Sequence, residues 1–174
     1  MAPRAVVIGP PGAGKSTIGR LLAERLAVGF RDTDDDIVRT EGRAIADIFT
    51  TDGEAVFRKI EEDVVATALA EHDGVLALGG GSVLSEATRE RLAGHPVVYL
   101  SVGLAEGAKR VGLSTARPLL AGLNPRATFK ALLDERIPVY RSAASVELPT
   151  DRLTPDEVVA QIVDALWGVD GSPS

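Results

Sequence analysis

The residues best suited to chemistry lie in one short stretch, residues 9–16, whose sequence GPPGAGKS matches the pattern G-x-x-x-x-G-K-[ST]. In such a loop, glycines let backbone N–H groups turn inward around phosphate oxygens. The Lys15 side chain would reach the β- and γ-phosphates, and the Ser16 hydroxyl would bind Mg²⁺. A merely glycine-rich turn is the alternative, and the eight matched positions argue against it. We therefore predict a nucleoside triphosphate site formed by Gly12, Ala13, Gly14, Lys15, Ser16 and Thr17.

The segments on either side of this loop have the patterns of a strand and a helix. Residues 6–8 form an apolar run that stops at Gly9, as a buried parallel strand does when it enters a loop. Apolar residues at helical spacing then predict a helix over Lys15–Leu26. Further along, strands are predicted over residues 30–32, 74–78, 96–101 and 143–148, and helices near 34–41, 45–50 and 56–72, after Ser85, from Arg126 and after Thr154. This alternation predicts an α/β fold in which a parallel sheet is flanked by helices on both faces.

Aspartates gather just after the second predicted strand, at the edge of a parallel sheet where ligands bind. Asp32 could order the Mg²⁺ shell through water, and Asp34 could accept a proton or a hydrogen bond from an attacking hydroxyl. The alternative is that these carboxylates only stabilise a helix N-terminus. We favour function for Asp32 and Asp34, because a metal ion needs ligands, and the structural role for Asp35 and Asp36.

Two other features are ambiguous on their own. The glycine run, residues 79–81, follows a predicted buried strand and indicates either a ligand that approaches the main chain closely or a wide turn. Arg58 has Glu54 and Glu62 at i−4 and i+4, and this spacing alone favours an ion-pair ladder on a helix surface.

The helix and strand patterns lapse over residues 112–125, where glycines and prolines surround Arg117. Such a segment predicts a mobile lid loop. Arg117 could then swing over a transferred phosphoryl group, and a solvated loop cation is the alternative.

Composition and charge exclude several classes of protein. The chain has 174 residues, 45% of them hydrophobic, which predicts one domain with its own core. Its net charge of -6 has the wrong sign for a protein held on nucleic acid or anionic lipid by charge alone. It lacks cysteine and has only two histidines, which argues against thiol catalysis and against a Cys- or His-based metal site. With no signal peptide or membrane span in view, we expect a cytoplasmic protein.

The phosphate loop alone does not separate kinases from GTPases and ATP-driven motors. A GTPase would need a base-reading N-K-x-D motif, and no Asn-Lys pair occurs in the chain. A motor usually carries an acidic residue at the end of an apolar strand, whereas the strand over residues 74–78 ends in the glycine run. A small-molecule kinase remains.

Taken together, these motifs resemble those of the shikimate kinase family in order and spacing, over about residues 4–165. Besides the phosphate loop, the resemblance rests on DTD at 32–34, FRKIE at 57–61, GGGSV at 79–83, RPLL at 117–120 and RIPVY at 136–140. It implies a P-loop, nucleoside-monophosphate-kinase-like fold with a five-stranded parallel sheet in a three-layer sandwich. It also implies transfer of the ATP γ-phosphate to the 3-hydroxyl of shikimate, on the route to chorismate and the aromatic amino acids.

The same resemblance assigns roles to individual residues. Asp34 would hold the hydroxyls of shikimate, and Arg58 and Arg136 would grip its carboxylate. The other implied shikimate contacts are Phe49, Phe57, Glu61, Gly79, Gly80 and Gly81. Lys15 and Arg117 would stabilise the phosphoryl group, Ser16 and Asp32 would bind Mg²⁺, and Arg110 and Pro155 would sandwich the adenine of ATP.

We therefore expect a single kinase domain over residues 1–174, acting as a monomer. Within it we expect a substrate-binding region near 33–61, the lid near 112–125 and a flexible tail over 168–174. Two alternatives remain open: another small kinase, for gluconate or a nucleotide, and a regulator that binds nucleotide without turnover.

Overall fold

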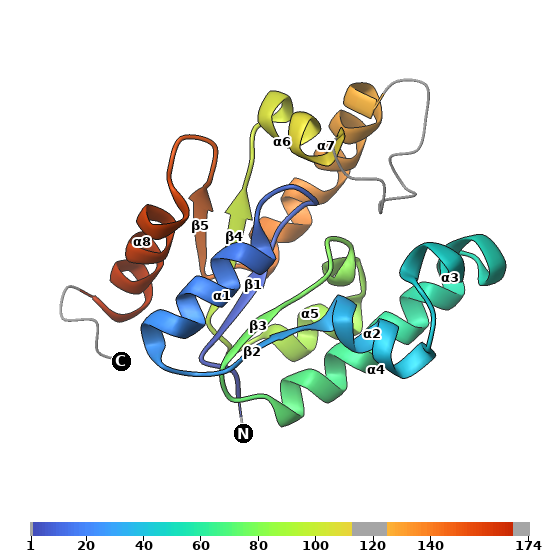
Figure 1. Cartoon of the computed structure of the whole chain (residues 1–174), viewed down its shortest axis with the longest axis horizontal. Coiled ribbons are helices and arrows are strands. Elements are labelled where there is room, and N and C mark those ends of the chain that lie inside the picture. The colour runs from blue at the N-terminus through green and yellow to red at the C-terminus, as the bar shows by residue number, and fades with distance from the viewer. Residues whose placement is uncertain (1, 113–124, 169–174) are drawn as a thin grey trace.

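A single parallel sheet forms the centre of the protein in the computed structural model, which describes residues 2–112 and 125–168. The spatial order of the strands is β2-β3-β1-β4-β5, and every pair is parallel (Figure 1). The strands are β1 Ala5–Ile8, β2 Phe30–Asp32, β3 Val75–Ala77, β4 Val97–Ser101 and β5 Val146–Pro149. This confirms the predicted α/β architecture. The motifs follow the carboxyl ends of β1, β2 and β3, which lie at the same end of the parallel sheet.

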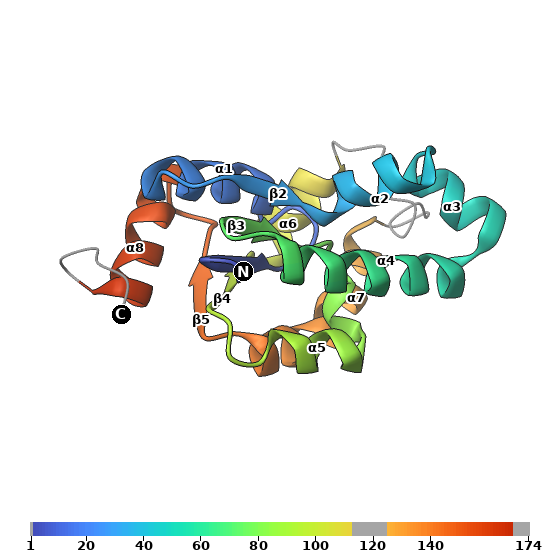
Figure 2. The ribbon, with the colours of Figure 1, turned by 90° about the horizontal axis from the view of Figure 1, so that it is seen from below.

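Helices cover both faces of the sheet because side chains alternate along each buried strand. On β1, Ala5 and Val7 lie in one hydrophobic cluster with residues of α1 (Lys15–Leu26) and α8 (Pro155–Trp167). The next residues along, Val6 and Ile8, lie in a second cluster with residues of the helices on the other face. Those helices are α4 Glu54–Glu71, α5 Glu86–Leu92 and α7 Pro125–Ala143. Figure 2 shows α1 on one side of the sheet and α5 and α7 on the other.

A third, smaller cluster lies beyond the β2 edge of the sheet. Here α2 (Thr33–Glu41), α3 (Ile45–Asp52) and the first half of α4 meet around Ile37, Ile48 and Phe57, all three buried. Figure 1 shows α2 and α3 extending away from the strands. The substrate-binding region predicted near residues 33–61 therefore has a small core of its own.

The helix caps agree with the sequence. The Ser85 side chain accepts a hydrogen bond from Thr88 N at the start of α5, after the short 3₁₀ helix η1 (Ser82–Leu84). Thr154 and Glu157 form the reciprocal capping box of α8.

Two elements differ from the prediction. The helix α6, Leu104–Gly112, was not predicted, and β5 begins at Val146 rather than near residue 143. The second difference arises because α7 continues to Ala143, with Pro138 inside it. None of the described helices is long and apolar enough to cross a membrane.

Candidate active site

The phosphate loop joins the end of β1 to the first turn of α1, as predicted. Gly9, Gly12 and Gly14 have φ angles of 152°, 85° and 86°, which residues with a Cβ rarely adopt. At Gly9 a Cβ would also overlap the carbonyl oxygen of Leu100 on β4. No side chain caps the N-terminus of α1, so the N–H groups of its first turn remain available for an anion.

Beside this loop lies a cavity of about 230 Å³ that contains the predicted nucleotide and metal residues. Lys15 is buried, and its Nζ donates to the carbonyl oxygen of Pro10 at 3.1 Å. The Ser16 hydroxyl donates to Asp32 Oδ2 at 2.7 Å, while Asp32 Oδ1 accepts from Asp34 N at 2.9 Å and so caps α2. Asp32 therefore takes the helix-capping role that the sequence offered as the alternative, and its second carboxylate oxygen contacts Ser16, the other residue predicted to bind Mg²⁺. The cavity is lined by Gly12, Gly14, Lys15, Ser16, Thr17, Asp32, Asp34 and Leu78.

The donors in this cavity fit Mg²⁺. Ser16 and Asp32 offer one hydroxyl and one carboxylate in contact, and Mg²⁺ commonly takes one or two protein oxygens together with water and substrate phosphates. Among residues 2–112 and 125–168, no group of three or more His, Cys, Asp or Glu side chains could form an all-protein metal cage. A cation held here would depend on the phosphates of a bound nucleotide.

Asp36 has a different role. Asp36 is buried and pairs with Arg31 at 2.6 Å and with Arg39 at 3.0 Å. This confirms the structural role predicted for Asp36, although its partners are arginines rather than a helix N-terminus.

The glycine run after β3 touches several parts of the site at once. A Cβ on Gly79 would lie 2.7 Å from Asp34 Oδ1 and 2.8 Å from Glu61 Oε2, and a Cβ on Gly80 would lie 3.1 Å from Pro11 Cδ. At Gly81 a Cβ would overlap the Arg58 guanidinium, 2.5 Å from its Cζ. The run forms a turn, closed by the bond from Ser82 N to Gly79 O, and it is glycine because side chains from α2, α4 and the phosphate loop pack directly on its backbone.

Arg58 lies at the junction of α4 and the glycine run rather than on an open helix surface. Its Nη1 donates to the buried Glu61 at 2.8 Å, and its Nη2 lies 3.4 Å from Glu54. The predicted ladder is therefore half right: Glu54 is a partner, whereas Glu62 instead accepts from Ser85 Oγ at 2.6 Å. The second partner of Arg58 is Glu61, three residues later on the buried side of α4.

The Arg58 guanidinium also lies near two aromatic rings, those of Phe49 and Phe57. Their ring centroids are 5.9 Å and 5.3 Å from Arg58 Cζ, and the two rings are 4.6 Å apart. The Arg58 Nε is buried, and no hydrogen-bond partner for it exists among the described residues. Phe49, Phe57, Arg58 and Glu61, which we predicted to be shikimate contacts, therefore lie in contact with one another.

Arg136 reaches the same region from α7. Its side chain is 4% exposed, and no ion pair among the described residues includes it. Burial raises the pKa of the neighbouring Tyr140 hydroxyl to about 12, while the positive charges of Arg136 and, more weakly, Arg58 oppose that rise. Both arginines therefore lie near one hydroxyl, although 78 residues separate them in the sequence. A buried cation without a carboxylate partner is expensive unless a ligand supplies the negative charge.

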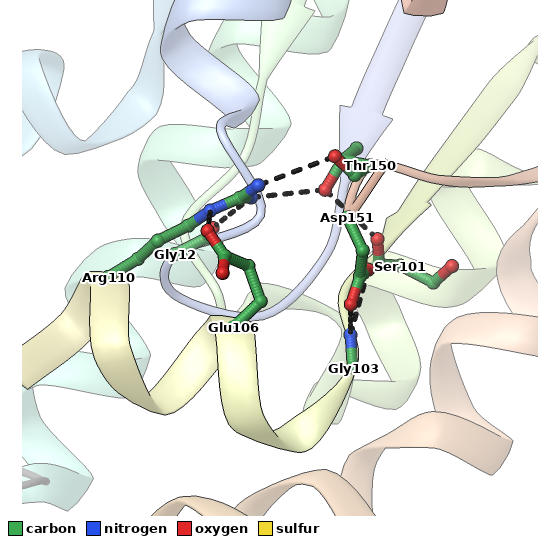
Figure 3. A network of polar contacts seen from close by, with 7 residues as sticks. All are labelled: Gly12, Ser101, Gly103, Glu106, Arg110, Thr150 and Asp151. Carbon is green, nitrogen blue, oxygen red and sulfur yellow. Dashed lines mark hydrogen bonds and ion pairs between the residues drawn. The ribbon is translucent and has the colours of Figure 1, made fainter. Parts of the chain in front are cut away.

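A second cavity, of about 220 Å³, lies on the other side of the phosphate loop and contains the residues predicted to bind adenine. Arg110 on α6 donates from Nη1 to Gly12 O at 2.9 Å and to Thr150 Oγ1 at 3.2 Å, and from Nε to Glu106 at 3.1 Å (Figure 3). Pro155, at the start of α8, lines the same cavity. The structure thus brings Arg110 and Pro155 together. The predicted lid residue Arg117 lies outside the described residues.

The whole chain is similar to proteins of one family. The model of the shikimate kinase family matches residues 11–167. The chain belongs to the shikimate kinase family. A shikimate kinase of Saccharopolyspora erythraea is 72% identical over 94% of each chain, and one of Mycobacterium avium is 57% identical over 98% of this chain and 97% of its own.

Solved structures of shikimate kinases have the same fold as this chain. The shikimate kinase of Acinetobacter baumannii in complex with shikimate has 35% sequence identity and a TM-score of 0.90, and the alignment covers 94% of this chain and 92% of that one. As a member of the shikimate kinase family, the chain is an ATP-dependent phosphotransferase. The predicted fold and reaction class are therefore confirmed.

Sequence reasoning assigned no role to three residues that make contacts in the candidate site. Thr150 and Glu106 hold Arg110, and the Tyr140 hydroxyl donates to Gly80 O at 2.5 Å. Tyr140 ends the RIPVY motif one helical turn after Arg136, which puts both side chains on one face of α7. Thr150 contacts Arg110 only because the tertiary fold brings together residues 40 positions apart in the sequence. Glu106 lies on α6, a helix that was not predicted.

Proposed function

We propose that this kinase transfers the γ-phosphate of ATP to the 3-hydroxyl of shikimate, giving shikimate 3-phosphate and ADP for the biosynthesis of aromatic amino acids. The observation that carries the proposal is the buried Arg136. It has no carboxylate partner among the described residues, and it lies near Arg58 and the glycine run. A small monoanion would compensate that charge, and the carboxylate of shikimate has the matching chemistry.

The acceptor hydroxyls have their own partner. Asp34 lies beside Gly79 and lines the same cavity as Lys15. In the reaction the hydroxyl oxygen forms a bond to the γ-phosphorus, and the bond from that phosphorus to the β,γ-bridging oxygen breaks. ADP leaves with the electron pair, and the hydroxyl proton passes toward Asp34.

The charge of the transferred group would be stabilised mainly by the phosphate loop. Lys15 and the N–H groups at the start of α1 would hold the β- and γ-phosphates, with Arg117 as the further cation that we predict. Mg²⁺, when bound by Ser16 and Asp32, neutralises negative charge on the β- and γ-phosphates. The adenine would lie in the cavity of Arg110 and Pro155.

The test is a direct assay of products. Purified protein is incubated with ATP, MgCl₂ and shikimate, and ³¹P NMR and mass spectrometry identify the phosphorylated acceptor. Gluconate and nucleoside monophosphates are matched acceptors, and omission of MgCl₂ is the metal control. We expect shikimate-dependent formation of one phosphomonoester and ADP. Faster phosphorylation of gluconate or a nucleotide, or ATP binding without turnover, would contradict the proposal.

A further inference from the structure

The three carbonyl oxygens of the glycine run are all engaged. Gly79 O accepts from Ser82 N and Gly81 O from Leu84 N, each at 3.1 Å, and both donors lie in the adjoining turn of η1. The middle one, Gly80 O, accepts from the Tyr140 hydroxyl at 2.5 Å. Only this middle bond comes from a distant part of the sequence, 60 residues away.

The N–H groups of the same run are not used within the described fold. None of the hydrogen bonds among residues 2–112 and 125–168 has the N–H of Gly79, Gly80 or Gly81 as its donor, although all three residues are buried. Buried N–H groups are normally paired. The run therefore presents donors to a ligand while its acceptors are held by the protein.

The bond from Tyr140 determines where one of these donors points. The chain has no cis peptide bond among its described residues, and in a planar trans peptide the C=O and the N–H point in opposite directions. Tyr140 belongs to the core cluster that contains Val6 and Ile8, behind the run. Because Gly80 O points to that core, the N–H of Gly81, in the same trans peptide unit, points away from it.

Tyr140 is well suited to hold a fixed direction. Its side chain is fully buried and stacks on Tyr99 of β4 with the ring centroids 5.0 Å apart. Burial raises the pKa of its hydroxyl to about 12, so the hydroxyl remains a donor at neutral pH. Arg136 lies one helical turn earlier and contacts the same hydroxyl.

We propose that Tyr140 is a positioning residue of the acceptor site: by holding Gly80 O, it aims the unused N–H of Gly81 at the acceptor and fixes it relative to Arg136. This inference rests on the proposed function, in that the acceptor is taken to be shikimate. It predicts that loss of the Tyr140 hydroxyl weakens binding of shikimate and leaves binding of ATP unchanged.

The first experiment compares Tyr140→Phe with Tyr99→Phe. Both variants lose one hydroxyl from the same stacked pair, but the Tyr99 hydroxyl makes no hydrogen bond among the described residues, so Tyr99→Phe is the matched control. We expect Tyr140→Phe to raise the KM for shikimate about tenfold, the equivalent of one hydrogen bond of about 1.4 kcal/mol. The KM for ATP should stay within about twofold, and Tyr99→Phe should resemble the wild type in both constants.

A second measurement does not depend on the stability of Tyr140→Phe. The chain has only two tyrosines, so the Tyr99→Phe protein grown with 3-fluorotyrosine carries one ¹⁹F probe, at position 140. We expect its resonance to shift on saturation with shikimate and not with ADP.

The outcomes separate this inference from the function on which it rests. If the wild type does not phosphorylate shikimate, the proposed function fails. If the wild type does so, the positioning role is overturned by any of three results: an unchanged KM for shikimate in Tyr140→Phe, equal increases in the two KM values, or a ¹⁹F resonance that does not respond to shikimate.

Discussion

The phosphate loop and the proposed acceptor site differ in what holds them in shape. The phosphate loop is eight consecutive residues, and its conformation follows largely from the positive φ angles of Gly9, Gly12 and Gly14, with one hydrogen bond to Gly12 O from the distant Arg110. The acceptor site is assembled from α2, α4, the glycine run and α7, and it is held by contacts between side chains and backbone far apart in the sequence. The first can therefore be identified from a short motif, whereas the second exists only after the chain has folded.

The two regions also differ in electrostatics. The phosphate loop uses N–H groups and Lys15 beside the carboxylates of Asp32 and Asp34. In the proposed acceptor site, Arg58 is compensated by Glu54 and Glu61, whereas Arg136 pairs with no carboxylate in the described part of the chain. Substitutions in the first region should therefore affect catalysis with any acceptor, and those in the second should affect the acceptor selectively.

The largest effect is expected from Lys15→Met. Removal of the cation leaves the charge of the transferred phosphoryl group without its main protein partner, so kcat should fall by at least about 10³-fold, or ~4 kcal/mol in the barrier. Steady-state assays with saturating ATP and shikimate measure it. The fold should remain intact by circular dichroism, and a loss confined to the KM for shikimate would contradict the division between the two regions.

Asp34→Asn tests the residue that faces both regions. Its carboxylate lies in the cavity of Lys15 and against Gly79, and removal of a general base or an orienting carboxylate costs about 10²- to 10⁴-fold in kcat. Asp35→Asn is the neighbouring control. A kcat for Asp34→Asn within threefold of the wild type would remove Asp34 from the reaction.

Arg136→Met separates affinity from stability. Loss of a charged hydrogen-bond donor should raise the KM for shikimate about 10²-fold, or ~2.7 kcal/mol. The KM for ATP should not change. Because a buried cation without an ionic partner is unfavourable in the free protein, the Tm without shikimate should be equal or higher. A lower Tm together with an unchanged KM would show that Arg136 serves the fold instead.

Gly79→Ala should produce a smaller loss. Its Cβ would press on the carboxylates of Asp34 and Glu61 at 2.7 Å and 2.8 Å, and the displacement of Asp34 should lower kcat/KM for shikimate about tenfold or more. Gly29→Ala is the control, because the nearest atom to that Cβ is His72 Cε1 at 3.6 Å. Equal activity of the two variants would show that the run tolerates side chains.

The smallest effect is expected outside both regions, at the capping box of α8. Hydrogen bonds from the backbone and side chain of Thr154 lower the pKa of Glu157 below its ordinary value of 4.5. A carboxyl whose pKa is lower in the folded state stabilises the protein above the unfolded pKa, and that stability is lost as the pH falls through the folded pKa. Urea unfolding should therefore show Glu157→Gln slightly less stable than the wild type at pH 7, with the difference disappearing in acid. A difference that persists at low pH would contradict this origin.

The same contrast explains what could be predicted from the sequence. Periodicity and caps identified the helix Lys15–Leu26, the cap at Ser85 and the capping box at Thr154, because each depends on neighbours within a few residues. The short helix α6 was not predicted. The start of β5 was predicted too early because α7 continues to Ala143 through Pro138, a residue that usually ends a helix.

Tertiary contacts likewise limited prediction of the site. Helical spacing predicted an ion pair between Arg58 and Glu62. In the folded chain Arg58 instead donates to the buried Glu61, and Glu62 accepts a hydrogen bond from Ser85. Arg136 carried no signal by itself; its burial and its lack of an ionic partner among the described residues are properties of the folded chain.

The small core of α2, α3 and α4 has a consequence for how such an enzyme can diversify. Phe57 of α4 belongs to that cluster, whereas Val65 and Leu69, later in the same helix, pack on the sheet. Mutations around Ile37 and Ile48 can therefore reshape the pocket for a new alcohol while the strands that carry the ATP loop keep their packing, so that acceptor choice can evolve separately from the phosphate donor.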